Sequence, residues 1–175
     1  MRYYNLIENI NKIRHYNLSS ILIVSDVHKE GNQSLESILK NISGKRFENY
    51  DFLLKEHLLK KTNFKVDIKI IKTKKNLYEL KSRSRIAIVS STTSAAVDLL
   101  LMGYQIIIPL NFTSLNFSPL KNYENVTFVS DYSKINMILS QKLDKIKKNS
   151  NFKFKNNFFK YSPNLDGWKK ILNER

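Results

Sequence analysis

Six short runs rich in Ile and Val alternate with stretches of helical periodicity along most of the chain. The runs cover residues 19–27, 50–57, 66–71, 85–91, 104–110 and 125–131. Each run is nearly continuously apolar, which is typical of strands buried on both faces of a parallel sheet. Between the runs, apolar residues recur at intervals of three and four, as in amphipathic helices. The pattern predicts β-α-β units with right-handed crossovers, and hence a Rossmann-like, doubly wound, mainly parallel sheet of about six strands.

The length of 175 residues allows one such domain and is too short for two ordinary ones. We expect residues 1–18 to form an N-terminal helical segment and residues 19–141 to form the Rossmann-like nucleotide-binding domain. Residues 142–157 are basic and polar without a clear period, which predicts a linker, with the end of a surface helix as the alternative. Residues 158–175 contain a Ser-Pro helix start signal and the single Trp, which predicts a C-terminal helix that docks on the domain.

The net charge of +15 points to an anionic partner, such as a phosphorylated substrate, a nucleic acid or an anionic membrane. Most of the excess is Lys, in a sequence also rich in Asn, Ile, Phe and Tyr. AT-rich codons produce this composition without selection for binding, and specific nucleic-acid readout favours Arg. We therefore expect no specific nucleic-acid partner, and an anionic inner-membrane surface stays open as a peripheral contact.

The absence of cysteine excludes disulfides, zinc-thiolate sites and cysteine nucleophiles. The sequence also has no Asp-x-Asp motif, so we expect neither a metal nor a cofactor. No apolar run approaches the roughly 18 residues that a membrane-spanning helix needs. We expect a cytoplasmic protein, with peripheral attachment to the inner membrane as the alternative.

Residues 85–103, RIAIVSSTTSAAVDLLLMG, place a cluster of hydroxyl residues between a strand and a helix that Gly103 is expected to cap. In parallel sheets, ligands bind at the carboxyl ends of the strands. Helix starts there carry unpaired N–H groups and a partial positive charge, which suit a phosphate. One Ser or Thr is enough to cap the helix, so the cluster predicts a phosphate site. Its candidate residues are Ser90, Ser91, Thr92 and Thr93.

Lys55 and His57 end the second strand run, at the same predicted edge of the sheet. A cation there can neutralise a phosphate, although an isolated His is also commonly structural or exposed. Asp98, in the helix led by the hydroxyl cluster, is a candidate ribose ligand or simply an exposed helical Asp. Asp26 ends the first run and His28 follows it, so a helix cap, a ribose ligand and a catalytic base stay open for this pair.

The words LLKEHLL (residues 53–59) and VSSTTSAAVDLLLMGYQIIIPL (residues 89–110) resemble motifs of the donor-binding, C-terminal domain of GT-B glycosyltransferases. The likeness is greatest to bacterial surface-polysaccharide enzymes of the sialyltransferase, polysialyltransferase, capsule and O-antigen types. It extends loosely from about residue 21 to the tail. The resemblance implies half of a GT-B fold. Three explanations stay open: a fragment of a longer enzyme, one subunit of a two-chain transferase, and a stand-alone domain that binds nucleotide without catalysis.

By this resemblance, His57 contacts the nucleotide phosphate, and Asp98 stands where many GT-B enzymes have a ribose-binding Glu. The phosphate motif falls on Ser90, Ser91 and Thr92. The sequence departs from the family in having Glu56 and Leu58 in place of the prolines that flank the His. Family members with this His and no Gly-rich loop often use CMP-sugars, so a CMP-sugar is the expected donor and a UDP-sugar the alternative.

The function expected from the sequence is donor binding for glycosyl transfer in the synthesis of capsule, O-antigen or lipooligosaccharide. His57 would stabilise the leaving phosphate, and the catalytic residues stay unknown. Two alternatives remain open: the donor domain of a polyol phosphotransferase of the teichoic-acid type, and a basic, non-catalytic domain that binds nucleic acid or an anionic membrane.

Overall fold

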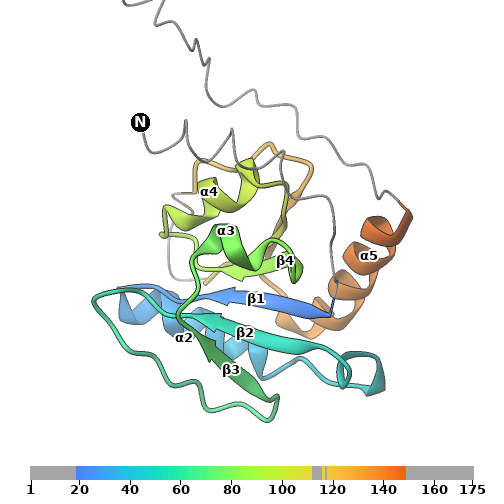
Figure 1. Cartoon of the computed structure of the whole chain (residues 1–175), viewed down its shortest axis with the longest axis horizontal. Helices are drawn as coiled ribbons and strands as arrows, with labels where there is room; N and C mark the ends of the chain where they lie inside the picture. The colour runs from blue at the N-terminus through green and yellow to red at the C-terminus, as the bar shows by residue number, and fades with distance from the viewer. Residues whose placement is uncertain (1–18, 112–115, 117, 149–175) are drawn as a thin grey trace, which may run out of the picture.

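The computed structural model describes residues 19–111, 116 and 118–148. These residues form a Rossmann-like α/β fold built on one six-stranded, all-parallel sheet, which confirms the fold class predicted from the sequence (Figure 1). The spatial order is β3-β2-β1-β4-β5-β6. The strands are β1 (Ser20–Val24), β2 (Asp51–Lys55), β3 (Ile70–Thr73), β4 (Ser84–Val89), β5 (Gln105–Pro109) and β6 (Val126–Val129).

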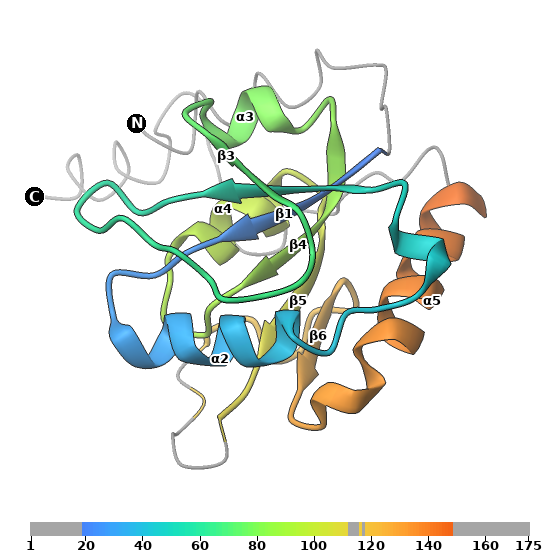
Figure 2. The same cartoon turned by 90° about the horizontal axis from the view of Figure 1, so that it is seen from below.

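Helices cover both faces of the sheet (Figures 1 and 2). On one face lie α2 (Lys29–Leu39) and α5 (Ile135–Lys148), together with the short 3-10 helices η1 (Lys45–Phe47) and η2 (Tyr132–Lys134). On the other face lie α3 (Leu77–Leu80) and α4 (Ala95–Leu101). The sheet is therefore the middle of three layers, as its continuously apolar strands require.

The side chains of β1 show how the strands serve both layers. Ile21 and Ile23 pack in the core beneath α2 and α5, whereas Leu22 and Val24 pack in the core beneath α3 and α4. All four are at most 5% exposed. Successive residues of a strand point to opposite faces, so each of these four positions of β1 needs an apolar residue.

The end of α4 follows the sequence prediction. Gly103 has a φ of 79°, its N–H donates to the carbonyl of Leu100 at 2.9 Å, and the N–H of Tyr104 donates to the carbonyl of Leu99 at 3.0 Å. This is the Schellman arrangement, in which a left-handed residue closes the helix. Gly103 is confirmed as the C-terminal cap, because a glycine adopts that φ without steric cost.

The linker predicted from residue 142 begins inside α5 instead. Leu143 and Ile146 are 3% and 5% exposed and belong to the core under α2 and α5. Lys142 is also buried, and its Nζ donates to Gln105 Oε1 at 3.2 Å and to the carbonyl of Asn125 at 3.3 Å. The lysines of this stretch concealed its apolar helical spacing. Residues 149–157 of the predicted linker, and the predicted terminal segments 1–18 and 158–175, lie outside the described residues.

The first turn of α2 approaches the end of β4 closely at Gly31. A Cβ at this position would lie 2.5 Å from Ser90 Oγ and 2.8 Å from Asp26 Oδ2. Both distances are shorter than side-chain carbon and oxygen atoms tolerate. Glycine therefore allows the helix to pack against two polar side chains at the carboxyl edge of the sheet.

We predict that Gly31→Ala lowers the free energy of unfolding by about 1–3 kcal/mol, because the added methyl group overpacks this contact. Helix propensity alone would give the opposite sign, since Ala is the better helix former. Urea denaturation at neutral pH measures the difference. The matched control is Ser37→Ala on the exposed side of the same helix, which should change stability by less than about 0.5 kcal/mol. A Gly31→Ala protein as stable as this control would show that the close contact is not needed.

Candidate functional site

The register of the sheet brings three strand ends together at one edge. Val24 at the end of β1 pairs with Lys55 of β2 on one side and with Val89 of β4 on the other. The residues that follow these three are therefore neighbours in space, although they are far apart in the sequence. β1 and β4 also mark the point where the strand order reverses, which is where Rossmann-like sheets bind ligands.

The buried carboxylate of Asp26 links the segments that leave β1 and β4. Asp26 is 2% exposed. Its Oδ1 accepts a hydrogen bond from the backbone N–H of His28 at 2.9 Å, and its Oδ2 accepts one from the hydroxyl of Thr92. The hydroxyl of Thr92 lies 3.1 Å from that of Ser90. On the α2 side, Asn32 accepts from the backbone N–H of Asp26 at 2.9 Å and donates to its carbonyl at 2.7 Å.

These donors decide the charge of Asp26. Burial alone would raise the pKa of its carboxyl group, but the His28 N–H and the hydroxyls of Ser90 and Thr92 outweigh burial and hold the pKa below its usual value. Nearby His28 adds a smaller effect of the same sign. Asp26 is thus a carboxylate at neutral pH and is already engaged by three donors. This geometry favours a structural anchor, a role that the sequence did not suggest, over the catalytic base that it left open.

The hydroxyl cluster divides into buried and accessible members. Ser90 is 1% exposed and lies beneath the site, while Ser91 is outside the cleft lining. Thr93 Oγ1 accepts from the N–H of Ala95 at 3.3 Å, so this residue helps to cap α4. Ser94 is exposed, lines the cleft and makes no side-chain capping bond. The predicted group is therefore brought together, but its members have different tasks.

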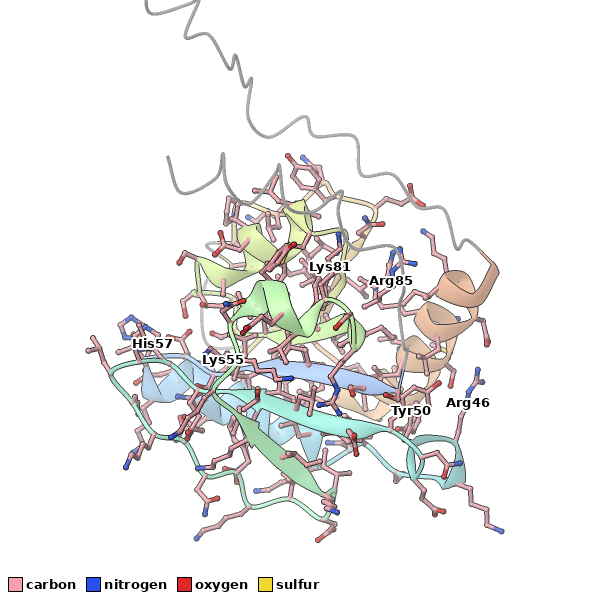
Figure 3. All side chains as sticks on the ribbon, viewed as in Figure 1. Arg46, Tyr50, Lys55, His57, Lys81 and Arg85 are labelled. Atoms are coloured by element: carbon pink, nitrogen blue, oxygen red, sulfur yellow. The ribbon has the colours of Figure 1, made fainter. Side chains whose placement is uncertain are left out.

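Lys55 and His57 lie at the carboxyl end of β2, at the opposite end of the strand from Arg46 and Tyr50 (Figure 3). Both line the cleft. The backbone N–H of His57 donates to Ser25 Oγ at 2.9 Å, which ties the end of β2 to that of β1. Lys55 Nζ donates to the carbonyl of Lys74 at 3.2 Å, and its ammonium group has two further N–H donors.

Glu56 adds less negative charge to the site than its sequence position implies. Its Oε1 accepts from the backbone N–H of Thr62 at 2.6 Å and forms an ion pair with Lys72 at 3.0 Å. The Thr62 N–H, opposed by burial and aided by Lys72, lowers the pKa of Glu56. The anion that replaces the family's proline is thus compensated by a lysine on β3.

Together these segments enclose a cleft of about 880 Å³ at the carboxyl edge. One wall contains Thr92, Thr93 and Ser94 with the start of α4, and the other contains Lys55 and His57. The β1–α2 loop contributes Val27 and His28, and the start of α3 contributes Leu77 and Tyr78. Val24 at the end of β1, Asn76 before α3 and Met102 after α4 complete the lining. A volume of this size, with apolar walls and a few convergent polar groups, suits a small organic ligand.

Asp98 is buried, at 4% exposure, and still lines the cleft from α4. It is therefore not the exposed helical Asp that the sequence also allowed. Its position on the cleft wall is compatible with the predicted contact to a ribose, which stays a prediction.

Three contributors were missed from the sequence: Ser25, which holds the end of β2, Gly31 and the start of α3. Asn76 caps α3 by accepting from the N–H of Glu79 at 2.9 Å, and Glu79 accepts from the N–H of Asn76 at 2.8 Å. The Asn-Leu-Tyr-Glu sequence has the spacing of this reciprocal capping box and could have located the helix start. Gly31 had a weaker signal, as one of only four glycines.

Within residues 19–111, 116 and 118–148, no group of three or more His, Asp or Glu side chains could hold a metal ion. No helix in the same part of the chain combines the length and hydropathy needed to cross a bilayer. No protein-family model matches the chain, and no curated protein is significantly similar to it. The family likeness therefore rests on the two quoted motifs alone.

We predict that Asp26→Asn lowers the free energy of unfolding at pH 7 by about 1.5 kcal/mol, because hydrogen bonds to a buried charge are replaced by weaker ones. The pKa of Asp26 is lower in the folded state than its usual value of 3.8, so the carboxylate stabilises the fold above that pH. This contribution is lost as the pH falls through the folded-state pKa. The difference between wild type and variant should therefore shrink below about pH 4.

Urea denaturation at a series of pH values measures this difference. Glu48→Gln is the matched control, because Glu48 is exposed and lies outside the cleft lining. A gap between wild type and Asp26→Asn that stays constant from pH 7 to pH 3 would contradict the assigned role of the carboxylate.

Proposed function

We propose that the chain binds a sugar nucleotide in the carboxyl-edge cleft and forms the donor half of a glycosyltransferase for bacterial surface polysaccharides. A CMP-sugar is the preferred donor and a UDP-sugar the second choice. The observation that carries the proposal is the cleft itself: it lies where the strand order reverses, with hydroxyl groups on one wall and Lys55 and His57 on the other.

The chemical make-up of the cleft supports a phosphorylated ligand with a ring system. Ser94 and Thr93 offer hydroxyl groups, and Lys55 and His57 offer cationic or N–H donors, to oxygen atoms bound between the walls. Tyr78 and the apolar residues beside it supply surface against which a base or a sugar can pack. A sugar nucleotide combines both features: its phosphate accepts hydrogen bonds, and its base and sugar are rings that can pack against an apolar surface.

In this proposal the cleft favours departure of the nucleotide. An acceptor oxygen attacks the anomeric carbon of the sugar, the bond from that carbon to the phosphate oxygen breaks, and the nucleotide leaves with the bonding electrons. Lys55, His57 and the hydroxyl groups stabilise the negative charge that develops on the phosphate, which requires no metal. The acceptor and the base that removes its proton come from a second domain or chain that faces this edge.

The experiment is isothermal titration of the full chain with CMP, UDP and GDP. We expect CMP to bind most tightly and Lys55→Gln to weaken it about tenfold, because a charge-assisted hydrogen bond to the phosphate is lost. Ser94→Ala should weaken binding by a smaller factor, about threefold, because only a neutral hydrogen bond is lost.

Lys45→Gln and Ser37→Ala are the matched controls, since both residues are exposed and lie outside the cleft. They should leave the affinity unchanged. Absence of binding by all three nucleotides at millimolar concentration would refute the proposal. Tighter binding of UDP would reassign the donor, and product analysis with the partner domain would separate glycosyl transfer from polyol-phosphate transfer.

A further inference from the structure

Exposed apolar side chains gather beside the mouth of the cleft. Four large apolar residues are exposed in the described part of the chain, and three of them are Val27 at 37%, Leu58 at 94% and Leu59 at 84%. The two leucines are adjacent, at the turn that follows β2. In Figure 3 their place can be found from His57, which directly precedes Leu58 and is labelled next to Lys55.

An ordered turn holds the leucines outward. His57 and Lys60 form an antiparallel bridge, with the N–H of Lys60 donating to the carbonyl of His57 at 3.1 Å. The N–H of Leu59 donates to His57 Nδ1 at 3.2 Å, and Lys60 Nζ donates to the carbonyl of Val27 at 3.1 Å. The turn is thus fixed to the β1–α2 loop, and the three apolar side chains form one tip.

The rest of the same loop uses its apolar residues differently. Phe64, Val66 and Ile68 pack partly buried against the core under α2 and α5. The loop therefore has a surface on which apolar residues can be buried, and the leucine pair lies outside it. An exposed apolar pair that is held in place is expected to have an external partner.

Lysines are frequent in the segments that follow β1, β2 and β3 at this edge. Those that are exposed or half-exposed include Lys29, Lys60, Lys61, Lys74 and Lys75. Of the acidic residues in these segments, Asp26 is buried and Glu56 is paired with Lys72, whereas Glu30 and Asp67 are exposed. The tip is thus apolar at its centre and strongly positive around it.

We propose that this tip, Leu58 and Leu59 with Val27 and the surrounding lysines, docks the protein on an anionic lipid bilayer. A convex apolar turn can enter the boundary between headgroups and acyl chains, and the lysines are then at the level of the anionic headgroups. A protein partner fits less well, because lysine is depleted from protein–protein interfaces. The docking does not depend on the proposed nucleotide ligand.

Docking of the tip also turns the cleft toward the membrane, because Leu58 and Val27 line its mouth. An acceptor that enters the cleft would then approach it from the bilayer surface. This arrangement favours an acceptor carried on a lipid over one that diffuses freely in solution.

The experiment is co-sedimentation of the full chain with vesicles of phosphatidylcholine alone or mixed in equal parts with phosphatidylglycerol. We expect binding to the mixed vesicles only, and a marked loss of binding between roughly 0.1 M and 1 M salt, where charge attraction is screened. Leu59→Ser should lower the partition coefficient by roughly fivefold to tenfold, since it removes most of one apolar side chain that would otherwise enter the bilayer. Leu58→Ser/Leu59→Ser should lower it further.

Two variants test the location. Met137→Ser removes the fourth exposed apolar residue, which lies on α5, and Lys45→Ser/Lys121→Ser removes two exposed lysines outside the tip. Met137→Ser should leave vesicle binding unchanged, and Lys45→Ser/Lys121→Ser should weaken it less than Lys60→Ser/Lys61→Ser. Leu59→Ser should keep its affinity for CMP, because Leu59 lies outside the cleft lining.

The proposal would be overturned if the wild-type protein did not bind the mixed vesicles. It would also be overturned if Leu58→Ser/Leu59→Ser bound them as well as the wild type does. Self-association in the absence of lipid that is lost in the same double variant would assign the tip to a second copy of the chain and would also overturn it. A failure of nucleotide binding with normal vesicle binding would refute only the proposed function.

Discussion

The carboxylate of Asp26 is the interaction on which the shape of the carboxyl edge depends. It is buried at the end of β1, where a charge without partners would be costly, and it accepts from the β1–α2 loop and from Thr92 after β4. Three donors keep it ionised. Gly31 makes the arrangement possible, because a side chain there would collide with Asp26 and Ser90. The β1–α2 loop and the segment after β4, which lead to helices on opposite faces of the sheet, are therefore fixed to each other.

The cleft follows from this constraint and from the register of the sheet. Asp26 engages the hydroxyl of Thr92, and the N–H of Ala95 donates to the hydroxyl of Thr93, which can still donate its own hydrogen; Ser94 makes no capping bond, so Thr93 and Ser94 are the hydroxyls that this turn offers to the cleft. On the other wall, Ser25 fixes the backbone of His57, and the same turn holds the leucine pair outward. A ligand cleft and an apolar, basic tip are thus built on one edge of the sheet, and the proposed membrane contact would set the direction from which the cleft is reached.

The fold was predictable because the four inner strands β1, β2, β4 and β5 are buried on both faces and so carry continuous apolar runs. The edge strand β3 is only half-buried, and it begins at Ile70 and not at residue 66, where the sequence predicted its start. Gly103 was predictable because a helix end with a left-handed residue has a local signal. The site was predictable to the level of its edge: Lys55, His57, Thr92, Thr93 and Asp98 all line the cleft. Their separate tasks were not, because the bond from Thr92 to Asp26 joins residues 66 positions apart. Residues 142–148 were assigned to a linker, with a helix end only as the alternative, because frequent lysines hide a stripe that is apolar only on its buried side.

The central claim is that the carboxyl edge between β1 and β4 binds a nucleotide. The most direct measurement is a titration of the isotope-labelled chain with CMP, followed by the backbone amide resonances. The account predicts progressive shifts for residues 25–28, 55–58 and 92–95, which surround the cleft, and none for Gln105 and Asn125 at the amino ends of β5 and β6. Shifts that gather at the amino edge, or no shifts at millimolar CMP, would contradict it.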